Sequence, residues 1–478
     1  MSALSSFSRS EVLVLLIQLV RAANGILWGN LMIWLLLGTG IFYTVRLGFP
    51  QFRRFGHMFK ILLGSRKAEE KGISSFQALC TGLAAQVGTG NIAGVATALV
   101  SGGPGAVFWM WMTALVGMAT ISAEAVLAQL FRVKNEDGTY RGGPAYYLER
   151  GLGQRWMGIL FAISIILAMP LVFNAVQCNS IVAGIRGAFF RDSSAENIEL
   201  YLGIGVAAVT AVVIFGGLRR IARVAEVVVP FMAIMYISIA LVTLILNIHH
   251  LPDIIALIFK SAFGVRQVAG GIMGHTVSEA LRYGVARGLF SNEAGMGSTP
   301  NAHATAEVKH PVRQGFTAMF AVFVDTIVIC SATALFILLS NQLDSGLTGV
   351  ELTQASLIDI VGSWGAYFLS IALTFFAWTS ILGNYYYGES NLMYLFPGSE
   401  GRVMLYIYRI GVLGMVIFGA VSSVPFVWEL ADFFNGLMAL LNLVGILCLS
   451  GLVVKMFKDY ERQLEANPKV EPVYIRKD

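Results

Sequence analysis

Apolar residues in this chain are gathered into long runs that are separated by short polar segments. A helix needs about 20 mostly apolar residues to cross a bilayer, and eleven runs approach or exceed that length. They lie at about 27–45, 76–100, 107–130, 156–181, 202–217, 225–248, 277–299, 316–339, 365–387, 403–421 and 427–456. The pattern predicts an all-α integral membrane protein with eleven transmembrane helices.

Three further apolar stretches are too short to span a membrane. Glu11 to Val20 predicts an interfacial helix, and Pro252 to Phe263 and Glu351 to Val361 predict short helices on the outer surface. The composition agrees with a membrane protein, because 56% of the 478 residues are hydrophobic and only 13% are charged. Soluble domains carry about 25% charged residues. This balance excludes a soluble multidomain enzyme and a disordered chain.

Basic residues are distributed unevenly over the predicted loops. Most of the 33 Lys and Arg residues fall in alternate loops, beginning with the loop from Arg46 to Lys71, and in the C-terminal segment. By the positive-inside rule these loops face the cytoplasm. We therefore expect a multi-pass protein of the plasma membrane, which in a bacterium is the inner membrane, with its N-terminus outside and its C-terminus in the cytoplasm. The net charge of +5 then reflects contact with anionic lipid headgroups rather than nucleic acid.

The residues that commonly bind metal ions are scattered along the chain. The four cysteines lie far apart in apolar stretches, without the spacing of a metal site or of a disulfide framework: Cys80, Cys178, Cys330 and Cys448. The pair His249-His250 lacks a visible third ligand. The sequence therefore predicts neither a metal site nor a cofactor.

Two predicted spans contain stretches of poor helix propensity. Residues 88–94 read Gly-Thr-Gly-Asn-Ile-Ala-Gly, and residues 291–300 read Ser-Asn-Glu-Ala-Gly-Met-Gly-Ser-Thr-Pro. Gly costs ~1 kcal/mol relative to Ala in a helix interior, and Asn and Ser compete for backbone hydrogen bonds. An unwound turn at membrane depth is tolerated only against protein or a polar cavity. The alternative for the first stretch is that Gly90 and Gly94 form only a helix-packing face.

The two predicted breaks lie five spans apart. An odd separation points the two halves in opposite directions, as in transporters built from an inverted repeat of five plus five helices. Spans two to six then form one repeat and spans seven to eleven the other, with span one as an extra N-terminal helix. The chain divides accordingly into an N-terminal segment with the first helix and its loop, two repeats and a cytoplasmic tail, at residues 1–75, 76–250, 251–456 and 457–478.

Several of these stretches resemble the alanine or glycine:cation symporter family, which includes the sodium:alanine symporters. Residues 102–117, Gly-Gly-Pro-Gly-Ala-Val-Phe-Trp-Met-Trp-Met-Thr-Ala-Leu-Val-Gly, resemble the family signature over its full length. Residues 88–91, 141–145 and 292–298 also look like family stretches, and the resemblance covers nearly the whole chain. It implies the leucine-transporter-type fold and the carriage of a small neutral amino acid with Na⁺, or in some members H⁺.

A zwitterionic amino acid needs hydrogen-bond donors for its carboxylate and acceptors for its ammonium group. We expect backbone N–H groups at the first break to bind the carboxylate, at Gly88, Thr89, Gly90 and Asn91. We expect freed carbonyls at the second break and one amide side chain to bind the ammonium group, at Phe290, Ser291, Asn292 and Gln86. The one lysine within the predicted spans, Lys455, lies at the very end of the last one, which favours a neutral amino acid over a dicarboxylate.

The resemblance also implies a cation site between the first break and span nine. It places the hydroxyls of Thr379 and Ser380 opposite oxygens at Gln86 or Val87. The alternative is that both hydroxyls bond back to the carbonyls of their own helix. In some H⁺-driven relatives of this fold, a lysine amine on the helix that corresponds to span six replaces the ion. Span six has no lysine, so Na⁺ is the favoured coupling ion.

Aromatic and hydroxyl side chains near the breaks are candidates for the wall of the substrate cavity. Trp378 and Thr374 lie one turn apart on the same predicted face of span nine, and an indole there would limit the cavity to a small substrate. Phe290 lies beside the second break and could act as a gate. The alternative for Trp378 is ordinary packing within the bundle.

Three carboxylates at membrane depth are candidates for gating or coupling: Glu124, Glu293 and Asp325. Ionisable groups are costly there and are functional candidates for that reason. Glu293 lies within the second break, and its alternative role is an ion pair with Arg282 or Arg287. Glu124 and Asp325 could instead make structural contacts at helix ends. Four amides share this depth: Asn174, Gln177, Asn384 and Asn442.

These observations predict a secondary active transporter that imports alanine or glycine with Na⁺ by alternating access. An H⁺-coupled or glutamine-selective symporter is the nearest alternative, and a passive channel or a membrane-embedded enzyme are the alternatives from other classes. The enzyme is disfavoured because no histidine lies in the middle of a span and neither an HExxH nor a GxSxG motif occurs. A P-loop is also absent, so a nucleotide is not an expected partner. Two matching breaks favour an enclosed midplane site over a channel.

Overall fold

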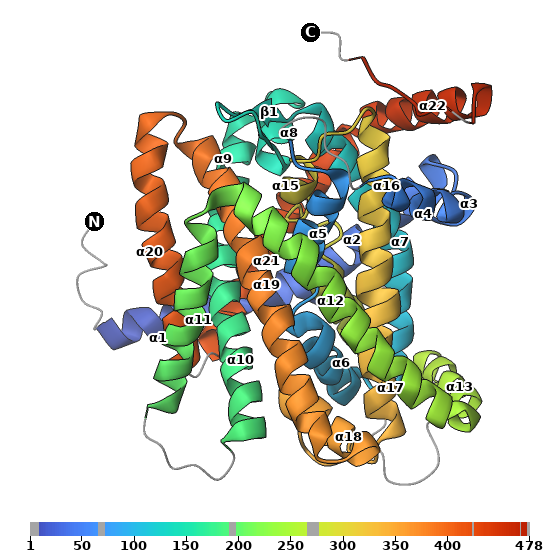
Figure 1. Cartoon of the computed structure of the whole chain (residues 1–478), viewed down its shortest axis with the longest axis vertical. Coiled ribbons are helices and arrows are strands. Elements are labelled where there is room, and N and C mark those ends of the chain that lie inside the picture. Colours follow the sequence, from blue (N-terminus) through green and yellow to red (C-terminus); the bar gives the residue numbers. More distant parts are fainter. Residues whose placement is uncertain are drawn as a thin grey trace.

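The computed structural model describes residues 9–65, 72–190, 197–264, 277–422, 425–468 and 470–475. The chain forms a bundle of helices with one short β-ribbon at the end of the bundle that also carries the C-terminal helix (Figure 1). The elements up to the middle of the chain are α1 (Arg9–Ile26), η1 (Leu27–Leu31), α2 (Met32–Arg46), α3 (Pro50–Arg53), α4 (Phe55–Leu63), α5 (Ser75–Gln86), η2 (Gly90–Gly94), α6 (Val95–Gly102), α7 (Gly105–Leu130), β1 (Val133–Lys134), β2 (Tyr140–Arg141), α8 (Pro144–Arg150), α9 (Arg155–Ile166), η3 (Leu167–Phe173), α10 (Asn174–Phe189), α11 (Ile198–Ile214), α12 (Gly217–Leu246) and η4 (Ile248–His250).

The second part of the chain continues with α13 (Leu251–Ala262), α14 (Val277–Asn292), α15 (Pro300–His303), α16 (Pro311–Val322), η5 (Phe323–Cys330), α17 (Ser331–Leu339), α18 (Gly349–Val361), α19 (Trp364–Leu395), α20 (Ser399–Val421), α21 (Pro425–Cys448) and α22 (Ser450–Ala466). The strands β1 and β2 are antiparallel. The segments η1, η2, η3 and η5 are π-helical turns that continue neighbouring helices, and such turns often mark functional sites.

Helices long and apolar enough to cross a membrane account for most of the predicted spans. Within the described residues, six such helices are continuous: Gly105–Leu130, Arg155–Phe189, Gly217–Leu246, Pro311–Leu339, Trp364–Leu395 and Ser399–Val421. The predicted spans at 27–45 and 202–217 correspond to the shorter apolar helices Met32–Arg46 and Ile198–Ile214. The chain is therefore a multi-pass membrane protein, and the number eleven stays a prediction.

Both predicted helix breaks are confirmed. Helix α5 ends at Gln86, the chain resumes as a helix at Gly90, and the two parts are bent by 51°. Helix α14 ends at Asn292, and the next helical turn begins at Pro300. The backbone of Glu293, Gly295 and Gly297 between them is left-handed, with φ values of 56°, 90° and 81°. Two glycines make this path accessible, whereas Glu293 is held in a conformation that is unfavourable for a side-chain-bearing residue.

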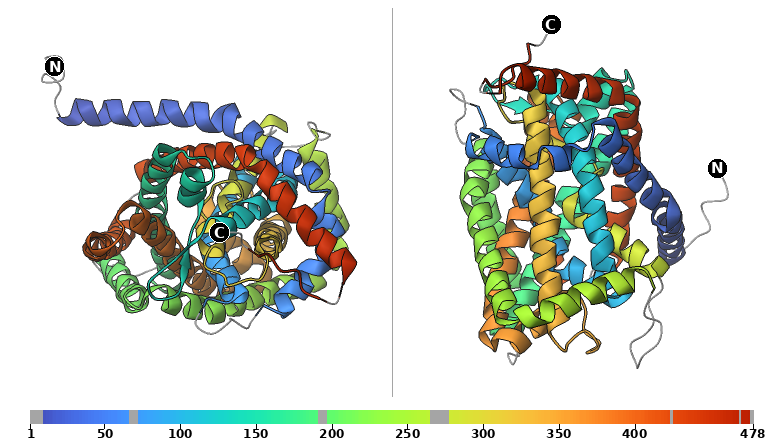
Figure 2. Two further views of the ribbon diagram at one scale, coloured as in Figure 1. Left: turned by 90° about the horizontal axis from the view of Figure 1, so that it is seen from above. Right: turned by 90° about the vertical axis from the view of Figure 1, so that its right-hand side faces the viewer.

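The prediction of where the last span ends is wrong. The apolar run predicts one helix over residues 427–456, but α21 ends at Cys448 and the following α22 turns by 60°. Helix α22 then crosses the end of the bundle, while α13 and α18 lie at the opposite end (Figures 1 and 2). The reason is its amphipathic pattern. Val453, Met456, Phe457 and Tyr460 are buried against the bundle, and charged residues occupy the other face.

The N-terminal helix is longer than the sequence predicts. Residues 11–20 predict a short interfacial helix, whereas α1 extends over Arg9–Ile26 and continues through η1 into α2. It projects from the side of the bundle (Figure 2). Because η1 and α2 follow without a loop, the first span and the interfacial segment form one bent helical unit.

Polar contacts fasten α22 to loops that precede it by hundreds of residues. Glu461 pairs with Arg53, at 3.2 Å, and with Arg54. The hydroxyl of Tyr460 lies 2.8 Å from His57 Nε2, and Asp459 lies 3.4 Å from Nε2 of the buried His310. Helix α22 thereby joins the loop after the first span to the start of α16.

We expect the docking of α22 to weaken as the pH falls. Burial lowers the pKa of His310 below its ordinary value of 6.5, and the hydrogen bond to Asp459 only partly opposes this effect. Below about pH 6.5 the unfolded chain therefore binds more protons than the folded chain, so stability falls with decreasing pH. Thermal unfolding between pH 8 and pH 5 measures this effect. His310→Gln should show a shallower decline than the unaltered protein, and identical slopes would contradict the expectation.

Candidate functional site

The two helix breaks lie against each other inside the bundle. The side-chain Nε2 of Gln86, at the end of α5, donates to the carbonyl of Asn292, at the end of α14, over 2.6 Å. A Cβ atom at Gly90 would lie 3.1 Å from the ring of Phe290 and 3.4 Å from Cα of Ser291. Gly90 therefore favours the close approach of the two segments, so the packing role that was the alternative for this glycine accompanies the break.

The first break is held together by side-chain amides. The backbone N–H of Gly88 donates to Oδ1 of Asn91 over 2.9 Å, and the N–H of Thr89 donates to Oε1 of Gln177 over 3.2 Å. Two of the N–H groups predicted to bind a carboxylate thus have side-chain partners here. Gln177, on α10, is the amide that closes this turn, and the sequence singles it out only as a polar group at membrane depth.

Asp325 joins both breaks. Its carboxylate accepts from Asn91 Nδ2 over 2.6 Å, from Ser291 Oγ over 2.8 Å and from Thr326 Oγ1 over 2.7 Å. Asn91 belongs to the first break, and Ser291 precedes the second. Asp325 lies in the π-helical segment η5 and is fully buried. This carboxylate therefore links the two broken helices by hydrogen bonds.

The other two candidate carboxylates support the second break. Glu293 accepts from Ser298 Oγ over 2.6 Å and from Thr299 Oγ1 over 2.9 Å, which closes the unwound loop on itself. Glu124, on α7, accepts from the backbone N–H groups of Gly295 and Gly297 over 3.3 and 3.1 Å. Its side chain also accepts from Asn442, on α21.

The alternative ion pair of Glu293 is not formed. Within the described part of the chain, Glu293 makes no salt bridge with Arg282 or Arg287, and its carboxylate faces the loop that follows it. Its hydrogen bonds fit a role in holding the break.

Ser380 and Thr379 differ in what they face. The hydroxyl of Ser380, on α19, donates to its own helix at Phe376, over 3.0 Å, and lies 3.4 Å from the carbonyl oxygen of Val87 at the first break. A Cβ atom at Gly88 would come within 2.3 Å of this hydroxyl. The hydroxyl of Thr379 donates to the carbonyls of Phe375 and Phe376, over 2.9 and 3.0 Å, and is 3.5 Å from the sulfur of Met232. Ser380 is thus the hydroxyl next to the break.

A small cavity of about 10 Å³, room for about one water molecule, lies between the breaks and α9–α10, α19 and α21. Its lining residues are Ala85, Gln86, Gly90, Met169, Phe173, Gln177, Phe290, Glu293, Met296, Asn384 and Asn435. Ligand pockets range from roughly 300 to 1,000 Å³, so the breaks have to move apart before an amino acid can enter this one. Three lining amides each have a buried oxygen without a hydrogen-bond partner in the described structure: Gln86, Asn384 and Asn435. Asn435 is missed by the sequence analysis, although it is a polar residue within the last apolar run.

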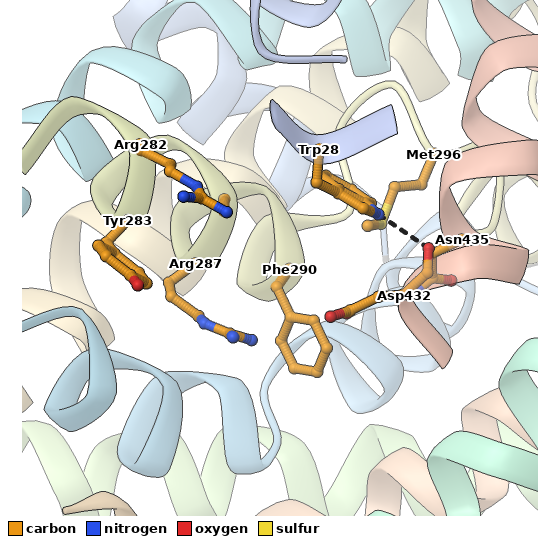
Figure 3. A pocket seen from close by; sticks show the side chains of 9 residues that line it. Trp28, Arg282, Tyr283, Arg287, Phe290, Met296, Asp432 and Asn435 are labelled. Atoms are coloured by element: carbon orange, nitrogen blue, oxygen red, sulfur yellow. Dashed lines mark hydrogen bonds between the residues drawn. The ribbon is translucent and has the colours of Figure 1, made fainter. Parts of the chain in front are cut away.

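A second cavity, of about 100 Å³, adjoins the first. The two share Phe290, Met296 and Asn435 as lining residues. Figure 3 shows Phe290 between Arg287 and Asp432, and the guanidinium carbon of Arg287 is 5.7 Å from the ring centroid of Phe290. The ring of Phe290 also lies 4.9 Å from that of Phe173. The ring of Phe290 thus lies between two adjoining cavities, and its role as a gate stays a prediction.

Trp378 and Thr374 do not line the cavity between the breaks. The indole N–H of Trp378 donates to Thr210 Oγ1, on α11, over 3.2 Å. The hydroxyl of Thr374 donates to the carbonyl of Ser370 in its own helix, over 2.7 Å. The predicted placement fails because one-turn spacing defines a shared face of α19 but does not say which neighbour covers that face.

We expect Trp378→Phe to affect stability more than transport. The substitution removes the hydrogen bond to Thr210, which contributes about 1 kcal/mol, and retains an aromatic ring for packing. Thermal unfolding and the substrate concentration for half-maximal uptake should be measured on the same preparation. We expect a lower melting temperature with an unchanged half-maximal concentration. A large change in substrate affinity would instead return Trp378 to the cavity wall.

The geometry consists of two broken helices that meet at an enclosed polar cavity, and comparison with known proteins identifies the family. The sequence model of the sodium:alanine symporter family matches residues 13–474. The chain belongs to this family. It is therefore an amino-acid symporter by family, and a transporter rather than an enzyme.

Characterised and named relatives cover nearly the whole chain. It is 47% identical to the probable sodium/glutamine symporter GlnT of Bacillus subtilis, over 96% of this chain and 93% of the relative. It is 45% identical to the amino-acid carrier protein AlsT of the same organism, over 96% and 95%. It is 43% identical to the sodium/alanine symporter AgcS of Methanococcus maripaludis, over 93% and 97%.

A solved structure supports the fold. The transporter MhsT, in a crystal structure with L-phenylalanine, superposes with a TM-score of 0.55 at 15% identity, over 79% of this chain and 89% of that one. This structural similarity shows that the chain has the leucine-transporter-type fold that is expected from its sequence.

Proposed function

We propose that this symporter imports a small neutral amino acid, alanine or glycine, together with Na⁺ by alternating access. The observation that carries the proposal is the enclosed cavity at the meeting point of the two breaks, next to the pair formed by Ser380 and the carbonyl of Val87. In inverted-repeat transporters the substrate and the coupling ion bind where the discontinuous helices meet. The protein then lies in the plasma membrane with its basic loops in the cytoplasm.

The chemistry of the cavity supports a neutral zwitterion as substrate. Its one ionisable lining side chain among the described residues is Glu293, whose carboxylate is engaged by Ser298 and Thr299. The three unpaired amide oxygens match the three N–H donors of an ammonium group. A substrate with a second charge would enter without a partner and incur a desolvation cost.

The oxygen atoms near the first break support Na⁺ as the coupling ion. Hard cations prefer oxygen ligands such as carbonyls and hydroxyls. Ser380 and Val87 supply one of each, and Gln86 supplies a further oxygen next to Val87, whereas Thr379 faces Met232. Asp325 connects the two breaks, so it can couple occupancy of the site to their movement.

Binding of labelled alanine to the purified protein tests the proposed substrate and ion. We expect saturable binding in Na⁺ that disappears when K⁺ replaces Na⁺, and competition by glycine that is stronger than competition by glutamine. Stronger competition by glutamine would indicate glutamine as the substrate, as in the name of the relative GlnT. Binding that does not depend on Na⁺ but depends on pH would show that H⁺, and not Na⁺, is the coupling ion.

A further inference from the structure

An apolar groove lies on the side of the bundle, away from the transport cavity. It occupies about 350 Å³ between α7, α12, α13 and the helical segment η5–α17. Its lining is apolar apart from Trp111 and Ser331, and these two satisfy each other because the indole N–H donates to the hydroxyl over 2.8 Å. The lining residues of the groove and of the cavity between the breaks do not overlap. The groove is therefore not part of the substrate path described above.

A polar pocket adjoins one end of this groove. The two share Ile254 and Leu338 as lining residues, and the pocket of about 550 Å³ is also lined by Asp253, Lys260 and His250. Among the residues that the structure describes, these three side chains make no salt bridge and no hydrogen bond. A positive and a negative group, two helical turns apart on α13, thus line the pocket at the end of the apolar groove.

The position of α13 fits a membrane interface. Its residues Ile254 and Ile258 are buried, whereas Asp253 and Lys260 are exposed. The helix lies at the end of the bundle opposite α22 (Figures 1 and 2). A helix with an apolar face and a charged face lies at the boundary between headgroups and acyl chains. The polar pocket then opens at headgroup level and the groove descends along the acyl chains.

We propose that the groove and the pocket together form a specific site for a phospholipid whose headgroup carries a phosphate and a primary ammonium group, as in phosphatidylethanolamine. An acyl chain occupies the groove. The phosphate contacts Lys260 and His250, and the ammonium group contacts Asp253, so that each charged side chain gains a partner of opposite sign or a hydrogen bond. Lipids that merely surround the protein do not need charged partners for their headgroups. The two opposite charges at the end of a defined groove distinguish this site from those contacts.

The bound lipid would brace the helix that carries the coupling carboxylate. Ile327, Val328 and Ser331 line the groove, and Asp325 lies in the same π-helical segment. The site thus lies behind the segment whose other face joins the two breaks.

Native mass spectrometry of the purified full-length protein tests the proposal. The protein is delipidated in detergent and titrated with phosphatidylethanolamine, phosphatidylglycerol or phosphatidylcholine of identical acyl chains. We expect one bound phosphatidylethanolamine to be retained at collision energies that strip the other two lipids. Lys260→Gln and Asp253→Asn should each raise its apparent Kd by about tenfold or more, which corresponds to the loss of one charge-assisted hydrogen bond.

Filling the groove supplies a second test that leaves the charges intact. Ala332→Phe adds bulk to the groove wall, and Gly411→Phe adds the same bulk at a position with nothing within 4 Å of its Cβ. We expect the first variant to lose the retained lipid and the second to keep it. Stronger retention of phosphatidylglycerol would overturn the assignment of the headgroup. Equal retention of all three lipids, or retention unchanged in Lys260→Gln and in Ala332→Phe, would overturn the site.

Discussion

Replacing Asp325 with alanine is expected to lower Na⁺-driven alanine uptake by at least about 100-fold. The substitution removes the carboxylate that accepts hydrogen bonds from Asn91, Ser291 and Thr326. The hydrogen bonds that link the two breaks through this carboxylate are therefore lost. Hydrogen bonds to a charged group contribute about 1.5–3 kcal/mol each, and about 2.8 kcal/mol corresponds to a factor of 100. Initial rates of uptake into proteoliposomes, normalised to the amount of reconstituted protein, measure the effect.

A matched carboxylate separates this role from a general effect of charge. Asp344 lies exposed in the loop before α18, so Asp344→Ala should leave uptake unchanged. Asp325→Asn keeps the size of the side chain, but its amide N–H group would face the donors that the carboxylate now accepts from. This variant should therefore show little more uptake than Asp325→Ala. If Asp325→Ala is monodisperse and retains more than a third of the uptake, the carboxylate does not couple the breaks.

Replacing Ser380 with alanine is expected to raise the Na⁺ concentration for half-maximal uptake by about tenfold or more. One hydroxyl ligand lost from a desolvated cation site costs about 1.4 kcal/mol or more, which is a factor of ten. The carbonyl of Phe376, which accepts from this hydroxyl, keeps its helical N–H donor in Ser380→Ala, so the folded protein should lose little stability. Uptake of alanine at a series of Na⁺ concentrations, at constant ionic strength, measures the change.

Two substitutions on α19 serve as controls for Ser380. Ser370 is a buried serine on the same helix, and Ser370→Ala should leave the Na⁺ dependence unchanged. Thr379→Val should have a smaller effect than Ser380→Ala, because Thr379 faces Met232 rather than the first break. Indistinguishable Na⁺ curves for Ser380→Ala and the unaltered protein would remove Ser380 from the cation site.

The breaks could be predicted from the sequence because their cause is local. Glycine at residues 88, 90 and 94, and again at residues 295 and 297, weakens a helix wherever it falls. The change of direction at Cys448 was harder to predict, because the apolar residues of α22 continue the run of α21. The charged residues of α22 interrupt that run at helical spacing, and this amphipathic signal was available in the sequence.

The contacts of the site could be predicted only in part, because they depend on which helices become neighbours. The sequence indicates Asp325 as a costly group at membrane depth, but it does not indicate that Asn91 and Ser291 converge on its carboxylate. Trp378 is an aromatic residue on the correct helix, and its contact with Thr210 depends on the packing of α11 against α19. Glu124 likewise reaches the second break through tertiary packing alone.

Concentrative uptake of labelled alanine into proteoliposomes tests the central claim most directly. The purified protein is reconstituted, and the initial rate and the final internal level are measured under an inward Na⁺ gradient, an equal K⁺ gradient and an inward pH gradient. The proposed mechanism predicts accumulation above the external concentration with the Na⁺ gradient alone, and collapse of that accumulation when a Na⁺ ionophore is added. Equal accumulation with K⁺, or accumulation driven by the pH gradient alone, would contradict Na⁺-coupled symport.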